Sequence, residues 1–137
     1  MRVVVIRSGS LADAAQVAAV QRDGWFAAYE GIIAHEVIDR VTAPDEGARV
    51  RQTFRTRPWQ RMFVAVADPG VIGYASCGPE VDVQVAACPY PLTQDGKQGQ
   101  MAELYALYVH PDWWSTGTGR ALMDRVLTWA RGAGYPA

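Results

Sequence analysis

The sequence is poor in the residue types that metal sites and disulfides require. Its 137 residues include two cysteines, two histidines and a single lysine, Lys97, and the net charge is −1. Cys77 and Cys88 match neither a CxxC pair nor a zinc spacing, so we expect reduced structural thiols and no metal site. A chain this close to neutrality has no overall field that attracts nucleic acid, so local geometry must hold any anionic ligand.

Long hydrophobic runs are also missing. The longest early run, residues 3–6, is ended by Arg7 and is too short for a signal peptide or a membrane span. We therefore expect a cytoplasmic protein with no membrane partner. The length corresponds to one domain, and half of the residues are hydrophobic, which is typical of a globular fold.

The local patterns predict a mixed α/β (α+β) domain with the element order β-α-α-β-β-β-α. Ser10 with Asp13 indicates one helix start, and Thr42, followed by Pro44 and Asp45, indicates another. The predicted strands cover residues 2–7, 61–67, 71–77 and 101–110. The predicted helices cover residues 10 to about 22 or 25, 36–40, 42–55 and 117–131, with a break at Gly31.

Two further segments connect the predicted strands. Asp68-Pro69-Gly70 is a turn signal, so the strands on either side of it should form an antiparallel hairpin. Alternating residues over 81–85 are typical of an edge strand, and residues 88–99 resemble a long exposed loop.

A glycine-rich loop, Ser115-Thr116-Gly117-Thr118-Gly119, lies between the strongest predicted strand and the last helix. Unpaired amides and the positive end of the helix dipole make such a helix start an anion site. The candidate phosphate-binding groups are the amides of residues 117–121, the two hydroxyls before them and the Arg120 side chain. In order these residues are Ser115, Thr116, Gly117, Thr118, Gly119, Arg120 and Ala121.

The loop does not match the common nucleotide-binding patterns. No lysine follows the glycines, as a P-loop requires, and Leu122 occupies the last position of GxGxxG. Taken alone, the two glycines fit a tight turn without ligand equally well.

The wider context resembles a known family. Residues 103–111 (ELYALYVHP), followed after a short connection by residues 117–122 (GTGRAL), strongly resemble motif A of the GNAT superfamily of acyl-CoA-dependent N-acyltransferases. The family pattern there is (Q/R)xxGxG(A/K), and the resemblance covers residues 102–135. Trp114 stands at the position usually taken by Gln or Arg, which weakens the signature more than the site, because backbone amides bind the phosphates in that family. The preceding elements match the first half of the family fold, and residues 25–33 resemble its first interhelical region.

The resemblance implies acetyl-CoA as the co-substrate and a set of binding groups. Backbone groups of Leu107, Tyr108 and Val109 would bind the pantetheine arm, and one of their N–H groups would polarise the thioester carbonyl. Only about one alkylamine in a few thousand is neutral at pH 7, so a general base helps. Glu103 is the candidate base, and the alternative is a strand-end carboxylate that pairs with an arginine. We assign no general acid for the leaving thiolate.

The acceptor would enter opposite the cofactor. Candidate walls are Trp25, Tyr29 and Glu30, although at least half of the aromatic residues in this segment should belong to the core. The resemblance implies N-acetyl transfer to a primary amine of a small molecule or a peptide. The alternatives are an inactive acyl-CoA-binding or regulatory or assembly module, and an inert fragment of such an enzyme.

The end of the chain bears on these alternatives. In the family a further strand, a helix and a hairpin follow the motif A helix, and none of them follows Tyr135 here. We therefore expect residues 1–137 to form a single GNAT-like domain that is incomplete at its C-terminus. An open strand edge would favour a homodimer that completes the sheet in trans.

Overall fold

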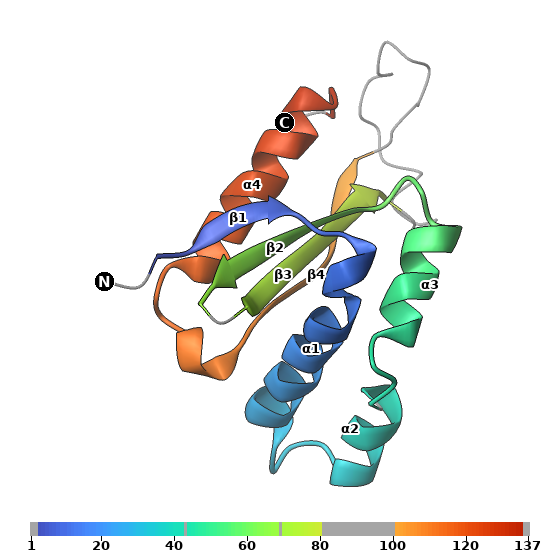
Figure 1. The fold of residues 1–137 in the computed structure, drawn as a ribbon, viewed down its shortest axis with the longest axis vertical. Helices are drawn as coiled ribbons and strands as arrows, with labels where there is room; N and C mark the ends of the chain where they lie inside the picture. The colour runs from blue at the N-terminus through green and yellow to red at the C-terminus, as the bar shows by residue number, and fades with distance from the viewer. Residues whose placement is uncertain (1–2, 43, 69, 81–100, 136–137) are drawn as a thin grey trace.

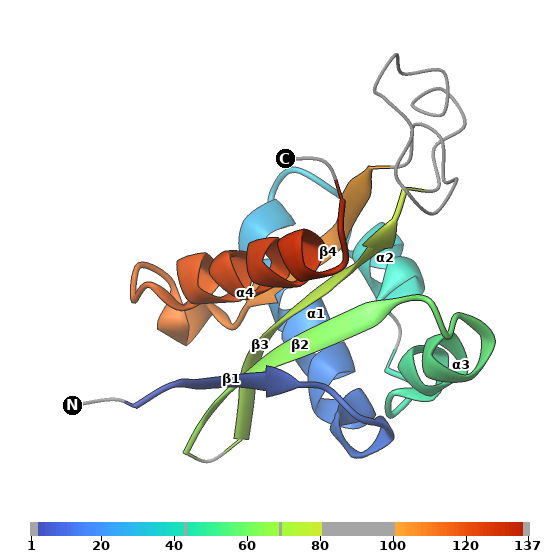
Figure 2. The same ribbon diagram turned by 90° about the horizontal axis from the view of Figure 1, so that it is seen from above.

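A four-stranded antiparallel sheet with the strand order β1-β2-β3-β4 forms the centre of the computed structural model (Figures 1 and 2). The structure describes residues 3–42, 44–68, 70–80 and 101–135. The strands are β1 (Val5–Ser8), β2 (Arg61–Ala67), β3 (Gly70–Pro79) and β4 (Ala102–Val109). Helices α1 (Ala14–Tyr29), α2 (His35–Val41) and α3 (Ala48–Thr56) precede β2, and α4 (Thr118–Gly132) follows β4. The predicted fold class is confirmed. Three helices lie between β1 and β2, as the three helical segments predicted there indicate, although the predicted element order counted only two.

The two faces of the sheet have separate cores. On one face α4 buries Leu122 and Val126 against β2 and β3, with Leu107 and Val109 of β4 packed around them. On the other face Val17 and Val20 of α1 pack against buried side chains of β2 and β3. This alternation follows from the twofold side-chain period of a strand and places helices on both sides of β4.

The antiparallel register between β3 and β4 is interrupted near the beginning of β4. Ser76 pairs with Ala106 and Cys77 pairs with Leu104, so Tyr105 is an extra residue without a partner on β3. A bulge of this kind bends the strand and increases its local twist. The predicted β2–β3 hairpin is confirmed, whereas the segments predicted over 81–85 and 88–99 lie outside the described residues.

The first helix differs from its prediction at both ends. A 3-10 turn over Leu11–Asp13 precedes α1, and α1 continues to Tyr29, where Gly31 (φ 80°) follows. The aromatic residues 25–29 are therefore helical instead of following the helix. The first strand also starts later than predicted, at Val5.

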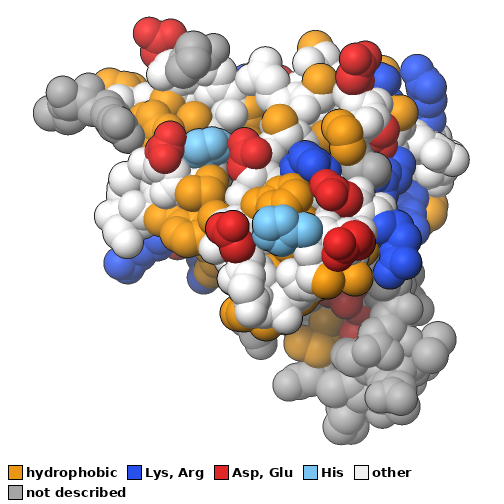
Figure 3. All heavy atoms as spheres, turned by 90° about the horizontal axis from the view of Figure 1, so that it is seen from below, with side chains coloured by type: hydrophobic (Ala, Val, Ile, Leu, Met, Phe, Trp, Pro, Cys, Tyr) orange, Lys and Arg blue, Asp and Glu red, His pale blue; other side chains and the backbone are white. Residues whose placement is uncertain are grey.

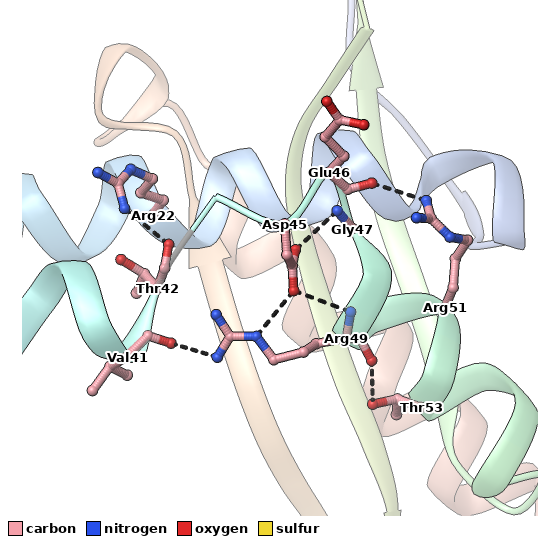
Figure 4. A network of polar contacts seen from close by, with 9 residues as sticks. All are labelled: Arg22, Val41, Thr42, Asp45, Glu46, Gly47, Arg49, Arg51 and Thr53. Carbon is pink, nitrogen blue, oxygen red and sulfur yellow. Dashed lines mark hydrogen bonds and ion pairs between the residues drawn. The ribbon is translucent and has the colours of Figure 1, made fainter.

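Thr42 does not begin the third helix, as its sequence context predicts. It ends α2, and its hydroxyl donates to the Ile38 carbonyl (2.7 Å). Asp45 has the capping role at the start of α3 instead. Its carboxylate accepts hydrogen bonds from the backbone amides of Gly47 (3.0 Å) and Arg49 (3.2 Å). Figure 4 shows the contacts of Asp45 with Gly47 and Arg49. A helix-starting carboxylate satisfies free amides and interacts favourably with the helix dipole.

No helix among the described residues is both long and apolar enough to cross a membrane. Cys77 is a free, buried thiol on β3, and burial raises its pKa to about 11. Cys88 lies outside the described residues.

Candidate active site

A cleft of about 400 Å³ lies at the free side of β4, between the second half of α1 and the start of α4. Five predicted cofactor-binding residues and one predicted acceptor-binding residue line it: Leu107, Tyr108, Val109, Ser115, Gly119 and Tyr29. Gly24, Ala28, Trp113 and Trp114 complete the lining. Ligand sites are clefts of this size, with few polar groups and mostly apolar walls.

The backbone leading into α4 turns through two left-handed residues. Ser115 has a φ of 62°, and Gly117, which caps α4, has a φ of 86°. Thr118 is buried, and its hydroxyl lies 2.9 Å from that of Thr116, which donates to the Trp113 carbonyl (2.5 Å). This chain of hydroxyl groups holds the turn. It also occupies the hydroxyl hydrogen of Thr116, one of the predicted phosphate donors.

The amides around this turn lie beside the cleft, and two residues of the turn, Ser115 and Gly119, line it. Within the described parts of the chain, no well-aligned hydrogen bond is found for the backbone N–H groups of residues 115–120. The first helical amide with an acceptor is that of Ala121, which donates to Gly117 (3.0 Å). Six donors without a well-aligned partner at the positive end of a 15-residue helix can form a site for an anion.

Gly119 lies directly between this turn and β4. A Cβ atom built on it would lie 3.8 Å from both the Leu107 and the Val109 side chains, which is ordinary contact distance. The fold therefore tolerates a small side chain at position 119. Arg120 is exposed beside the cleft but does not line it.

The backbone of β4 exposes hydrogen-bonding groups to the same cleft. His110 donates its amide to Ile72 of β3 (2.7 Å), while the Val109 carbonyl accepts from the Trp114 indole (2.7 Å) on the other side. Along an antiparallel strand, the N–H and C=O groups of successive residues point alternately toward and away from the neighbouring strand. The amides of Leu107 and Val109 therefore point away from β3, and that of Tyr108 points toward it. No strand in the described part of the chain pairs with this edge.

Tyr108 contributes its side chain instead. Its ring stacks on Tyr74 (centroids 5.7 Å apart), and its hydroxyl accepts from the Trp25 indole N–H (2.8 Å). Trp25 in turn packs edge-on against Tyr29 (4.9 Å). Gly24 allows this approach, because a Cβ there would lie 3.3 Å from the Tyr108 ring. Gly24 is an isolated glycine inside a helical pattern, which is a sequence signal for a close contact of this kind, although no prediction was based on it.

The remaining predicted residues lie outside the cleft. Glu103 lies opposite Gly78, four residues before Leu107, which corresponds to about 13 Å along a strand. Its Oε2 atom is buried and has no hydrogen-bond partner among the described residues. Burial raises the pKa of Tyr105, and the charge of Glu103 raises it further. Glu30 follows α1 and is exposed near His35 (3.8 Å).

Two histidines lie at the end of the molecule that Figure 3 shows, each with acidic side chains beside it. His110 contacts Asp23 of α1 (3.5 Å), and its Nδ1 accepts from the backbone amide of Asp112 (3.1 Å). This contact connects α1 to the turn before α4. His110 therefore helps to hold the two walls of the cleft together.

The chain matches the acetyltransferase (GNAT) family over residues 20–137. The uncharacterized N-acetyltransferase YuaI of Bacillus subtilis (strain 168) is 27% identical over 123 residues. The match covers 89% of this chain and 61% of that protein, so the chain spans less than two thirds of this curated relative.

Solved structures share the fold. The PaiA N-acetyltransferase of Thermoplasma acidophilum, in complex with coenzyme A, has a TM-score of 0.69 at 19% identity, over 97% of this chain and 75% of that one. A GNAT family acetyltransferase of Brucella melitensis, in complex with acetyl-CoA, has a TM-score of 0.64 at 21% identity, over 98% and 73% of the two chains.

Proposed function

Because this chain belongs to the acetyltransferase (GNAT) family, we propose that it transfers an acetyl group from acetyl-CoA to a primary amine of a small molecule or a peptide. The observation that carries the proposal is the row of amides without well-aligned partners over residues 115–120, beside the cleft that the open edge of β4 lines. When bound, acetyl-CoA supplies the activated acetyl thioester.

The described residues fit this co-substrate in two places. The free amides at the start of α4, with Arg120 beside them, match a pyrophosphate, which needs several donors and positive charge. The outward amides of Leu107 and Val109 match the amide groups of a pantetheine arm, which can pair with a strand edge as another strand does. Residues of both places, Leu107 and Val109 of β4 and Ser115 and Gly119 before and in α4, line the same cleft.

The proposed reaction moves one proton from the amine and delivers one to the departing sulfur. Glu103 remains our candidate for the base. At about 13 Å from Leu107 along β4 it would act through water instead of by direct contact. Tyr29 would form the acceptor side of the cleft. Trp25 does not line the cleft, but it packs on Tyr29 and its indole N–H donates to the Tyr108 hydroxyl, so it would orient both side chains.

The test of this proposal begins with binding. At 100 times its Kd, acetyl-CoA should stabilise the chain by about 2.7 kcal/mol, which thermal denaturation detects as a rise in Tm of about 10 °C. Gly119→Asp should abolish the rise, because its carboxylate would face the bound pyrophosphate. Gly119→Ala is the matched control and should retain it, since its methyl group makes only ordinary contacts. An unchanged Tm at millimolar acetyl-CoA would refute the proposal.

Turnover separates an enzyme from a binding module. Thiol release measured over a panel of amines should exceed the rate without amine, and it should be lost in Gly119→Asp. Binding of acetyl-CoA without amine-dependent thiol release would favour the acyl-CoA-binding module.

A further inference from the structure

The segment that forms α3 and β2 has an uneven charge composition. Residues 47–67 include five arginines and no acidic residue, so all 14 acidic residues of the chain lie outside this segment. Its first part, α3, packs on the α1 face of the sheet through Val50. The turn that connects α3 to β2 therefore concentrates positive charge on a chain whose net charge is −1.

Four of these arginines lie close together around that turn. Arg51 and Arg55 are four residues apart on α3, which places them on the same side of the helix. Arg57 ends α3, and its carbonyl accepts from the backbone amide of Gln60 (3.0 Å), so the chain turns back directly before Arg61 at the start of β2. Arg55, Arg57 and Arg61 are exposed, and Arg51 is half-buried.

The protein itself does not neutralise these four charges. The guanidinium of Arg51 donates to the Glu46 carbonyl (2.8 Å), and that of Arg61 donates to the Pro58 carbonyl (3.0 Å). Among the described residues, no Asp or Glu side chain forms an ion pair with any of the four arginines. Because a backbone carbonyl carries no net charge, the positive charges remain available to an anionic partner.

An aromatic side chain lies within this group of arginines. Trp59 is in the turn between Arg57 and Arg61, and it is 47% exposed. An exposed indole can cover an apolar side chain of a partner while the guanidinium groups bind its charges. Tryptophan and arginine are the residue types that most often dominate the affinity of protein–protein interfaces, so this combination favours a protein partner.

Carboxylates limit the positively charged area on two sides. Asp45 and Glu46 directly precede α3. Glu103 lies at the same end of the sheet as Arg61, because Arg61 pairs with Cys77, which pairs with the residue after Glu103. A long polyanion such as a nucleic acid would pass these carboxylates and be repelled, whereas a short acidic segment would not.

We propose that this arginine surface, formed by Arg51, Arg55, Arg57, Trp59 and Arg61, binds a short acidic segment of a partner protein. Aspartate or glutamate side chains of the segment would pair with the guanidinium groups, which match the planar shape of a carboxylate. An apolar side chain between them would pack on the indole. The proposal does not depend on acetyl transfer, because none of the five residues lines the cleft.

Three short labelled peptides of equal length test the proposal. Each has one central leucine and glycine spacers, and its remaining residues are glutamate, glutamine or lysine. Fluorescence anisotropy measures their Kd values on the 137-residue chain at low ionic strength. We expect the glutamate peptide to bind about tenfold more tightly than the glutamine peptide, because several ion pairs act together. The lysine peptide should bind most weakly, and added salt should reduce the difference.

Charge variants connect the binding to the surface. Arg57→Glu should weaken the glutamate peptide about fivefold, because it replaces an attraction by a repulsion. Arg57→Lys should retain most of the affinity. Arg131→Glu is the matched control, since it makes the same charge change at an exposed residue of α4, and it should leave the affinity unchanged. Thermal denaturation confirms that each variant is folded.

Four outcomes would overturn the proposal. The first is equal affinity for the glutamate and glutamine peptides, and the second is an equal loss in Arg57→Glu and Arg131→Glu. The third is tighter binding of an oligothymidylate of the same charge, which would indicate a nucleic-acid surface. The fourth is a loss in Arg120→Glu but not in Arg57→Glu, which would place the peptide at the start of α4.

Discussion

Single residues with unusual backbone angles shape the start of α4. Gly117 at φ 86° has open space around its Cβ position, so its glycine is explained by conformation and not by crowding. Ser115 at φ 62° adopts a conformation that costs a non-glycine residue about 1–2 kcal/mol. Together these residues form a turn of left-handed backbone beside the cleft, and successive amides in such turns can bind anions. The glycines indicated the turn in advance, whereas Ser115 carried no sequence signal.

Gly47 is the residue whose replacement should be most harmful outside the candidate site. It has a φ of 85°, and a Cβ there would lie 2.5 Å from the backbone of Ala14 and Ala15. Gly47→Ala should lower the free energy of unfolding by about 3 kcal/mol or more, from left-handed strain and the backbone clash together. Urea denaturation measures this change.

The matched control for that prediction is Gly31→Ala. Gly31 has a similar φ of 80°, but nothing lies within 4 Å of its Cβ position, so the variant should lose only about 1 kcal/mol. Equal losses in the two variants would show that crowding against α1 contributes nothing.

Between elements, side-chain contacts decide where helices begin and how they connect. Arg7 of β1 holds Asp13 at the start of α1 through two hydrogen bonds (2.9 and 2.8 Å), and Asp13 also accepts from the Ser10 amide (2.8 Å). Further along α1, Arg22 donates to the Thr42 carbonyl (3.0 Å) and so connects α1 to the end of α2. The sequence showed the capping pattern of Ser10 and Asp13, but it did not show that Arg7 of β1 pairs with Asp13.

The Arg7–Asp13 pair should make stability depend on pH in the acid range. The Arg7 hydrogen bonds lower the pKa of Asp13 below its usual value of 3.8, although burial opposes them. A carboxyl whose pKa is lower in the folded state contributes stability above its unfolded pKa and loses it as pH falls through the folded pKa. The free energy of unfolding of the wild-type chain should therefore exceed that of Asp13→Asn by about 2 kcal/mol at pH 7. This difference should shrink below about pH 4.

Urea denaturation at a series of pH values measures that difference. Asp39→Asn is the control, because Asp39 pairs with Arg22 on an exposed surface and should change stability by less than about 1 kcal/mol. A difference between wild type and Asp13→Asn that persists unchanged to pH 2 would contradict the assignment.

At the scale of the whole molecule, β4 is an edge strand of the sheet. No strand among the described residues pairs with its free edge. Exposed strand edges pair readily with other chains. We predict that the 137-residue chain forms a homodimer through β4, with twice the mass of the chain by light scattering. Acetyl-CoA should return it to the monomer, because both partners would use the outward amides of Leu107 and Val109. A monomeric mass at high concentration without ligand would contradict this prediction.

The sequence by itself determined the strands and helices with strong periodicity. It also indicated the glycine-rich turn before α4, because these features depend on neighbouring residues and on the side-chain periods of strands and helices. It did not determine that Asp45, instead of Thr42, binds the free amides at the start of α3. It also did not determine that Arg7 of β1 is the partner of Asp13. Only the tertiary structure decided that Tyr108 meets Trp25 and that Glu103 lies away from the cleft. Each of these contacts joins residues far apart in the chain, so packing and the bulge at Tyr105 decide them.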